Sequence, residues 1–328
     1  RFPDTGVGFS LKAVHAKPNI TPLFLTRTIS SGRLPSVHAS TMIELPQGRL
    51  RAFWYAGSRE GHRDIAIYTA VFDPITGSWG AERELFDRIN TQQPLYTYVK
   101  KLGNPAAFRA ADGRVWLFYV SSLWGWSASR INLAYSEDDG ENWSAPRRLV
   151  ASPFLNQSTL VRSPPFMFKD GTIGLPAYHE FLGKFCELLR LDGEGNIIHK
   201  QRLSRGRSTL QPAIVPYSRD KALCLMRPAG FSPPQIIACA TEDGGLTWSD
   251  AEPLPLESEY SGNAALRLDD GALLLAVRVK DDLFLTLSED MGQSWRTLHK
   301  VDQSSVEAVQ RSKTGGSYPC LLRAQAGE

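Results

Sequence analysis

The chain is poor in the residues that mark several large protein classes. Only 4 cysteines and 6 histidines occur among its 328 residues. No C-x-x-C spacing is present, so a zinc site is not expected and buried free thiols are the default state. A disulfide between Cys224 and Cys239 stays open if the two lie on adjacent strands. No residue pattern indicates a metal or an organic cofactor.

Long hydrophobic runs and one-sided charge are also missing. The longest apolar runs, such as residues 272–277, are far shorter than the roughly 20 residues of a membrane span. A total of 37 Lys and Arg against 34 Asp and Glu gives a net charge of +3 without a basic stripe, which argues against a nucleic-acid partner. We expect a soluble protein. The start at Arg1, without Met or an apolar leader, indicates trimming and slightly favours a secreted or periplasmic location.

Helical periodicity is scarce, whereas short β-branched and aromatic runs separated by turn residues are frequent. A phrase of the form S/T-x-D-x-G-x-x-W begins at Ser136, Thr241 and Ser288. Self-similarity at a period of about 20 to 50 residues is typical of propellers and solenoids. The last two copies begin 47 positions apart (241 to 288), about one four-stranded blade, and the 105 positions from 136 to 241 leave room for two blades.

The chemistry of this phrase predicts a turn. Its Asp can accept backbone N–H groups, its Gly can adopt positive φ, and its Trp can pack between neighbouring sheets. We interpret it as a lock on a hairpin and assign its Asp residues no catalytic role. Weaker versions occupy residues 72–79 and 191–196.

A second repeat lies upstream of these phrases: a polar or aromatic residue, often before Pro, then two apolar runs joined by a D-G-like turn. It begins at His38, Asn104, Ser163, Gln211, Asn263 and Tyr318. Each copy predicts the inner hairpin of a blade, so residues 1–328 are expected to form one all-β domain, a six-bladed β-propeller of four-stranded antiparallel blades, with seven possible. Few residues follow Tyr318, so residues 22–29 are expected to supply a strand that closes the ring and removes sheet edges.

Inner-hairpin geometry places the start of the first strand and the end of the second strand at one end of each blade, opposite the locks. The polar residues expected there, besides those that begin the repeats, are Arg33, Arg59, Glu60, Asp64, His179, Glu180, Arg227 and Arg278. Arg33, Arg227 and Arg278 come from three different blades. Because guanidinium groups pair with carboxylates, their convergence predicts an acidic ligand.

Each candidate also has a purely structural interpretation. Tyr318 can pack against Pro319, and His38 can be a hydrogen-bonded channel histidine. Asn104, Ser163 and Asn263 can bond backbone groups around the channel. Residues 58–64 can be an ordinary solvated loop.

The lock phrase is the Asp-box, or BNR repeat, and the chain resembles the sialidase/neuraminidase superfamily over nearly its whole length. Residues 32–35, Gly-Arg-Leu-Pro, are similar to the Arg-Ile-Pro motif of that family. The resemblance implies that Arg33, Arg227 and Arg278 bind a sialic acid carboxylate and that Tyr318 is the nucleophile. It therefore implies a glycoside hydrolase that removes a terminal acidic sugar.

The chain departs from the sialidase pattern at both proton-handling positions. Gln211 stands where sialidases place the Glu that activates the tyrosine, and a neutral amide cannot act as a base. The position of the acid/base Asp is replaced by a loop that offers Glu60, His62 and Asp64. Several segments look more like the sialidase-like BNR branch, which includes uronate-directed polysaccharide lyases.

Three functions are therefore carried forward, all with an acidic sugar or glycan as partner. In a hydrolase, Tyr318 attacks the anomeric carbon and Glu60 or Asp64 protonates the leaving oxygen. In a uronate lyase, His38 or His179 acts with Tyr318 and the arginines. The third is a glycan-binding propeller that has lost its proton-transfer groups.

Overall fold

The computed structural model describes residues 7–11, 25–152, 156–205, 208–230, 234–280, 282–301 and 318–324. These residues contain one α-helix, α1 (Arg88–Leu95), and two 3-10 turns, η1 (Pro46–Gly48) and η2 (Trp126–Ala128). Among the described residues, no helix has the length and apolar character needed to cross a bilayer. Strands make up the rest of the regular structure.

The strands form five antiparallel sheets. The first contains β1 (Ser36–Glu44), β2 (Leu50–Gly57), β3 (Ala66–Asp73) and β4 (Ser78–Trp79), with β5 (Arg83–Phe86) also paired to β3. The second contains β6 (Lys101–Arg109), β7 (Val115–Ser122), β8 (Ser129–Ser136) and β9 (Arg147–Arg148). The third contains β10 (Leu160–Val161) and β11 (Phe166–Met167), both paired with β12 (Ile173–His179), then β13 (Phe185–Leu191) and β14 (Ile197–Arg202).

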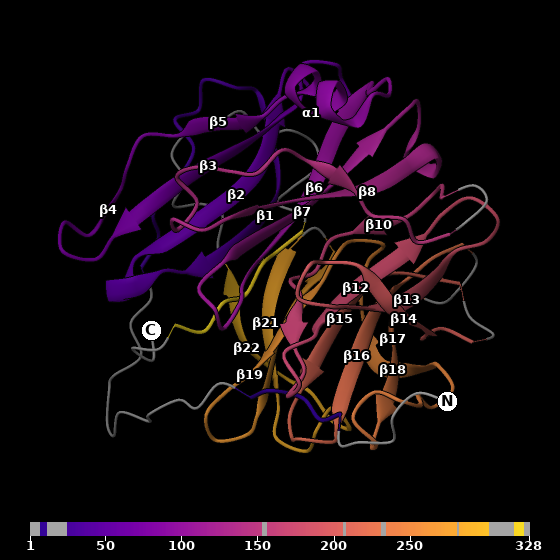
Figure 1. Ribbon diagram of the computed structural model, residues 1–328. Coiled ribbons are helices and arrows are strands. Elements are labelled where there is room, and N and C mark those ends of the chain that lie inside the picture. The colour runs from indigo at the N-terminus through magenta and orange to yellow at the C-terminus, as the bar shows by residue number, and fades with distance from the viewer. Residues whose placement is uncertain are drawn as a thin grey trace.

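The fourth sheet contains β15 (Thr209–Pro216), β16 (Ala222–Pro228), β17 (Gln235–Thr241) and β18 (Glu252–Glu257). The fifth contains β19 (Ala264–Arg267), β20 (Leu273–Val279), β21 (Asp282–Ser288) and β22 (Arg296–Val301). Figure 1 shows the first two sheets in the upper half of the molecule and the other three below and to the right. The first strand of each sheet packs toward the neighbouring sheets, which is the arrangement of propeller blades.

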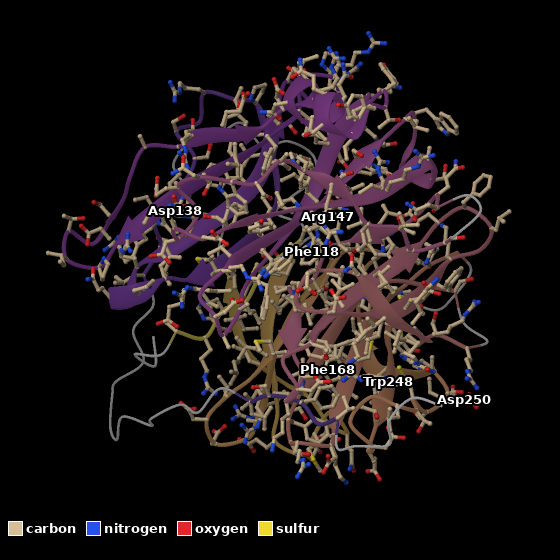
Figure 2. All side chains as sticks on the ribbon, in the orientation of Figure 1. Phe118, Asp138, Arg147, Phe168, Trp248 and Asp250 are labelled. Atoms are coloured by element: carbon tan, nitrogen blue, oxygen red, sulfur yellow. The ribbon has the colours of Figure 1, made fainter. Side chains whose placement is uncertain are left out.

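The second strand of a blade is buried on both faces because neighbouring blades cover it. All eight residues of β7 are buried, which explains why its sequence reads as a continuous apolar run instead of an alternating one. Figure 2 shows Phe118 of this strand near the middle of the molecule and Asp250 at its edge. The hydrophobic core therefore lies between blades, around the central axis.

The predicted locks form. In the second blade Asp138 accepts the backbone N–H of Asn142 at 2.8 Å and the hydroxyl of Ser136 at 2.8 Å. The same backbone bond links Thr247 to Asp243 (2.9 Å), Ser294 to Asp290 (2.8 Å) and, in a weaker copy, Asn196 to Asp192 (2.7 Å). The indole of Trp143 donates to the carbonyl of Gly140, at 2.8 Å, and its ring packs edge-on against Phe53 of the first blade. These turns therefore fasten strands and join blades.

The prediction of six blades is wrong for the part of the chain that the structure describes, which builds five. The sixth inner hairpin was expected at Tyr318, but residues 318–324 pair with no strand. They run between the first and fifth blades instead: Arg323 donates to the carbonyl of Arg267, at the end of β19, and the thiol of Cys320 bonds to Thr41 of β1. Within the described residues, an extended segment therefore lies where a further inner hairpin was predicted.

The N-terminal closing strand was expected at residues 22–29, of which 22–24 lie outside the described residues. Residues 25–29 form no strand, and Ile29 packs against the cluster of Trp54 and its neighbours in the first blade. Residues 7–11 lie elsewhere, beside the third and fourth blades, where Phe9 bridges Phe168 and bonds to the carbonyl of Arg219 (Figure 1). Closure of the ring by pairing of the two termini stays a prediction.

All four cysteines are free thiols. Cys224 and Cys239 are direct cross-strand partners of β16 and β17, the adjacency on which the disulfide alternative depended. Within the described ranges, no three His, Cys, Asp or Glu side chains gather as ligands for a metal ion.

Candidate functional site at the channel mouth

A repeated irregularity shapes the channel mouth. The pairing of the two inner strands shifts register after His38 in the first blade, after Gly103 in the second and after Leu210 in the fourth. At these shifts Ala39, Asn104 and Gln211 adopt left-handed φ values of 51°, 47° and 53°, and Tyr318 has φ 71°. Such bulges interrupt strand pairing and redirect side chains, commonly beside active sites. Here they make the polar residues of the second repeat available to the channel.

Tyr318 lies at the centre of the resulting cluster. Its ring meets the ring of His38 edge-on, with centroids 4.7 Å apart. Its hydroxyl lies 3.5 Å from Nη1 of Arg227, which donates to it. The guanidinium of Arg162 lies over the ring, 5.4 Å from its centroid. The fold assembles this cluster from distant parts of the chain: His38 comes from the first blade, Arg162 from the third and Arg227 from the fourth.

His38 connects this cluster to Glu60. Its Nε2 lies 4.0 Å from Oε2 of Glu60, whose side chain is 50% exposed. Burial lowers the pKa of His38, Glu60 opposes that shift, and the positive charge of Arg162 adds to it. The pKa of the buried Tyr55 is raised by burial and by Glu60. Because its pKa is lowered, His38 stays neutral and able to accept a proton down to a lower pH than an ordinary histidine.

A small hollow of about 180 Å³ lies against this cluster. Its lining includes His38, Tyr318 and Trp54, together with Ile29 and Ser30 of the segment that precedes the first blade. A small ligand group placed in this hollow would contact both rings of the His38 and Tyr318 pair.

Amides and tyrosines line the deeper part of the mouth. Nδ2 of Asn104 donates to the hydroxyl of Tyr178 at 3.0 Å. Gln211 and Asn263 are buried, and Oε1 of Gln211 and both polar atoms of the Asn263 amide have no hydrogen-bond partner. Since buried polar groups are normally paired, these atoms indicate a place for water or a ligand.

Glu180 and Lys101 add charge at the rim. Burial raises the pKa of Glu180, although Arg227 and Lys101 favour its ionised form. Burial lowers the pKa of Lys101, and Glu60 opposes this shift. The ammonium of Lys101 also lies 3.7 Å from the centre of the Trp126 ring.

Two of the predicted arginines form ion pairs with carboxylates. Arg33 is 75% exposed and pairs with Glu82 at 3.4 Å. Arg278 is buried and pairs with Glu259 at 3.2 Å. Of the three arginines expected to converge, only Arg227 therefore has a described contact with Tyr318.

The acid/base candidates His179 and Asp64 are each hydrogen-bonded to a neighbouring side chain. His179 bonds to Glu187 at 2.7 Å and stacks on Phe185. Asp64 bonds to His62 at 2.7 Å in the exposed loop after β2, which also contains the exposed Arg59. Burial alone would raise the pKa of Asp64, but hydrogen bonds from His62 and Ser58 together outweigh it and lower the pKa.

Arg162, Tyr55 and Tyr178 belong to the site but were not among the predicted site residues. Arg162 is 1% exposed and directly precedes Ser163, the start of the third inner hairpin. Tyr178 directly precedes His179, and Tyr55 lies near the end of β2. The signal was available, since each lies within a few residues of a predicted position, but the choice between neighbouring residues depends on which face of the strand each occupies.

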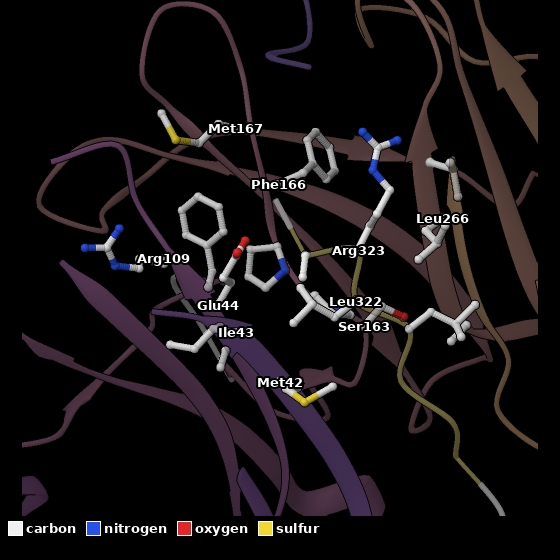
Figure 3. Close-up of a pocket in the computed structure, with 18 of the residues that line it drawn as sticks. Met42, Ile43, Glu44, Arg109, Ser163, Phe166, Met167, Leu266, Leu322 and Arg323 are labelled. Carbon is white, nitrogen blue, oxygen red and sulfur yellow. The ribbon is translucent and has the colours of Figure 1, made fainter. Parts of the chain in front are cut away.

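The channel continues below this cluster as a cavity of about 650 Å³. The later halves of the inner strands and residues 321–324 line it. Figure 3 shows Phe166, Met42 and Leu322 around this space, with Arg109 and Arg323 on opposite sides. Arg162, Ser163 and Asn263 line the end nearest Tyr318.

Repeated locked blades around a polar channel define a β-propeller of the BNR class. Residues 48–328 match the family model described as a BNR repeat-like domain, and the chain belongs to that family. No curated relative matches the sequence.

Solved structures with a similar fold include a Hadza microbial sialidase, Hz136, with a TM-score of 0.68, 16% identity and coverage of 84% of this chain and 61% of that one. An intramolecular trans-sialidase from Ruminococcus gnavus has a TM-score of 0.70 at 13% identity and covers 92% and 91%. An α-L-arabinanase from Penicillium chrysogenum has a TM-score of 0.67 at 15% identity and covers 92% and 90%. The family match and the shared fold confirm the resemblance to sialidase-like BNR proteins; at these identities the structures establish the fold alone.

Proposed function

We propose that this protein is a carbohydrate-active enzyme that cleaves the bond to a terminal acidic sugar in a glycan. One observation carries the proposal: Tyr318, His38 and Arg227, from distant parts of the chain, meet at the mouth of the channel. A tyrosine hydroxyl beside a cation and a neutral histidine suits chemistry at a carbon next to a carboxylate. The similar folds of sialidases and an arabinanase support a glycan as substrate.

The first form of the proposal is a hydrolase of the sialidase type. Arg227 pairs with the sugar carboxylate, and the oxygen of Tyr318 attacks the anomeric carbon. The bond to the leaving oxygen breaks as Glu60 donates its proton to that oxygen. His38 receives the tyrosine proton, since its ring contacts Tyr318 and Gln211 cannot accept it. Water then attacks the anomeric carbon as ionised Glu60 takes its proton, and the bond between that carbon and the Tyr318 oxygen breaks as His38 returns the proton to the tyrosine.

Arg278 and Arg33 have secondary roles in this proposal. Arg278 is held by Glu259 close to the predicted end of the channel and adds positive potential for an anionic sugar. Arg33, paired with Glu82 on the surface, does not contact the carboxylate.

The second form is a uronate lyase, which the neutral Gln211 favours. Neutral His38 removes the proton from the carbon that bears the carboxylate, and Arg227 stabilises the negative charge that develops there. The bond to the leaving oxygen breaks, a carbon–carbon double bond forms, and Tyr318 protonates the leaving oxygen. This route needs no carboxylate at position 211.

The test is incubation of the purified protein with a panel of sialylated and uronate-containing glycans. Free sialic acid and the ultraviolet absorbance of unsaturated uronate are measured together. Free sialic acid supports the hydrolase, and an unsaturated product supports the lyase. Binding of acidic glycans without either product would overturn the enzymatic proposal and leave a glycan-binding propeller.

A further inference from the structure

Three polar side chains at the inner end of the central cavity are almost completely buried and incompletely paired. Arg162, Ser163 and Asn263 have exposed fractions of 1%, 5% and 1%. All three line the same cavity. Among the described residues, Nε of Arg162, Oγ of Ser163 and both amide atoms of Asn263 have no hydrogen-bond partner. Several orphaned polar groups facing one cavity indicate an occupant that completes them.

The charge of Arg162 is the strongest of these signals. Its guanidinium donates to the carbonyl of Pro319, and no carboxylate within the described ranges forms an ion pair with it. Its other neighbours are the thiol of Cys320, whose pKa is raised by burial, and the tyrosines Tyr318 and Tyr178. Burial lowers its pKa. A buried cation without a counter-charge is costly, because desolvation is not offset by attraction.

The chemistry of the unpaired atoms selects the sign of the occupant. The N–H of Arg162, the hydroxyl of Ser163 and the amide nitrogen of Asn263 are all hydrogen-bond donors. The hydroxyl of Ser163 can also accept, but the amide oxygen of Asn263 is the one atom among them that can only accept, and it can face water while the nitrogen faces the occupant. A cation beside Arg162 would be repelled, and an apolar group would leave the donors unpaired. A small anion satisfies both the charge and the donors.

We propose that the inner end of this cavity binds a small monoanion, held by Arg162, Ser163 and Asn263. The anion is a halide or the carboxylate of an acidic sugar, which share this chemistry. It lies next to the proposed catalytic cluster, on the Arg162 side of the Tyr318 ring, whereas Arg227 contacts the tyrosine hydroxyl. Together with Arg162, the anion would form the surface against which the Tyr318 ring packs.

The proposal is tested by thermal unfolding of the full chain in sodium sulfate at constant ionic strength. Chloride, bromide or glucuronate is titrated in separate experiments. A bound anion raises the unfolding temperature in a saturable way, because it binds the folded state preferentially. Saturation by the halides identifies an inorganic anion, and saturation by glucuronate alone identifies a carboxylate.

Matched variants locate the binding. Ser163→Ala and Asn263→Ala are expected to raise the half-saturating concentration about tenfold, as expected for loss of a hydrogen bond to a charged group. Ser129→Ala is the control, because Ser129 is also a buried, unpaired hydroxyl but does not line the cavity. Bromide in crystals should give an anomalous signal beside Arg162. No saturable stabilisation by any of the three anions, or equal half-saturation in Ser163→Ala and wild type, would overturn the proposal.

The result is independent of the proposed activity. Tyr318→Phe should remove turnover and leave the anion titration unchanged. If the wild-type protein cleaves no glycan but is stabilised saturably by an anion, the proposed function is wrong and the anion site stands. If it cleaves a glycan but no anion stabilises it saturably, the anion site alone is wrong.

Discussion

The ring of His38 meets the ring of Tyr318 edge-on at 4.7 Å, although 280 residues (318 − 38) separate them in the chain. The contact joins the first blade to the segment that fills the gap between the first and fifth blades. Because His38 directly precedes the bulge in β1 and Tyr318 has left-handed backbone, both rings depend on local irregularity for their direction. This pair is the chemical centre of the site.

A comparison of Arg227 with Arg33 tests which arginine holds the carboxylate. Arg227→Met should lower kcat/KM on an acidic glycan by about 10- to 100-fold, since a charge-assisted hydrogen bond contributes about 1.5–3 kcal/mol. Arg33→Met should change it less than about threefold, because Arg33 is exposed and paired with Glu82. Steady-state kinetics of both variants provide the measurement. A large loss in Arg33→Met would show that the sialidase-type triad operates in solution.

The pH profile of kcat/KM tests the role of His38. As a proton acceptor, His38 must be neutral, and burial lowers its pKa below the ordinary 6.5. Activity should therefore persist as pH falls through 6.5 and decline only at lower pH. His38→Gln should lower kcat by about 10²-fold or more and abolish this acidic limb. An unchanged limb in the variant would assign the titration to another group.

The locks predict a specific acid sensitivity of the fold. Hydrogen bonds from Asn142 and Ser136 lower the pKa of Asp138 to about 2, from an ordinary value of 3.8. A carboxylate with a depressed pKa stabilises the folded state above its unfolded pKa and loses that contribution as pH falls through its folded pKa. Asp138→Asn should therefore destabilise the protein at pH 6. The difference from wild type should shrink between pH 4 and pH 2.

Denaturant unfolding at several pH values measures this difference. Asp250→Asn is the control, since Asp250 follows the lock of the fourth blade and its described hydrogen bond involves its backbone carbonyl, which accepts from Ser249, and not its carboxylate. If Asp138→Asn lowers the free energy of unfolding by the same amount at pH 6 and at pH 2, the account is contradicted.

Much of the architecture follows from the sequence for a physical reason. A lock needs Asp, Gly and Trp at fixed spacing, so Asp138, Asp243 and Asp290 could be found from the sequence together with their partners. The inner hairpins followed from the second repeat. Hairpin geometry places strand starts and strand ends at one end of each blade, and Tyr318 contacts His38 and Arg227 in the structure. The roles of these residues stay predictions.

The failures have equally specific causes. His179 and Tyr178 are adjacent on β12, and strand alternation sends Tyr178 to Asn104 and His179 to Glu187. Which of the two faces the channel depends on the register of the sheet. Arg33 precedes β1, so no strand fixes its direction, and its surface partner Glu82 is 49 residues away.

The predicted sixth blade shows the limit of counting repeats. Tyr318 and Pro319 match the start of an inner hairpin, but a hairpin needs a second strand, and residues 318–324 contact β1 and β19 through side chains and isolated bonds.

Arg162 was missed because an arginine that is fully buried without a carboxylate is not an expected core residue.

The most direct test of the account is the turnover and glycan binding of Tyr318→Phe, with Tyr135→Phe as control. Tyr135 packs on Trp116 in the second blade, away from the channel mouth. Turnover by Tyr318→Phe should fall at least about 10²-fold while calorimetric affinity for an acidic glycan stays within about threefold, and Tyr135→Phe should behave as wild type. Full turnover by Tyr318→Phe would contradict the claim that its hydroxyl takes part in bond cleavage.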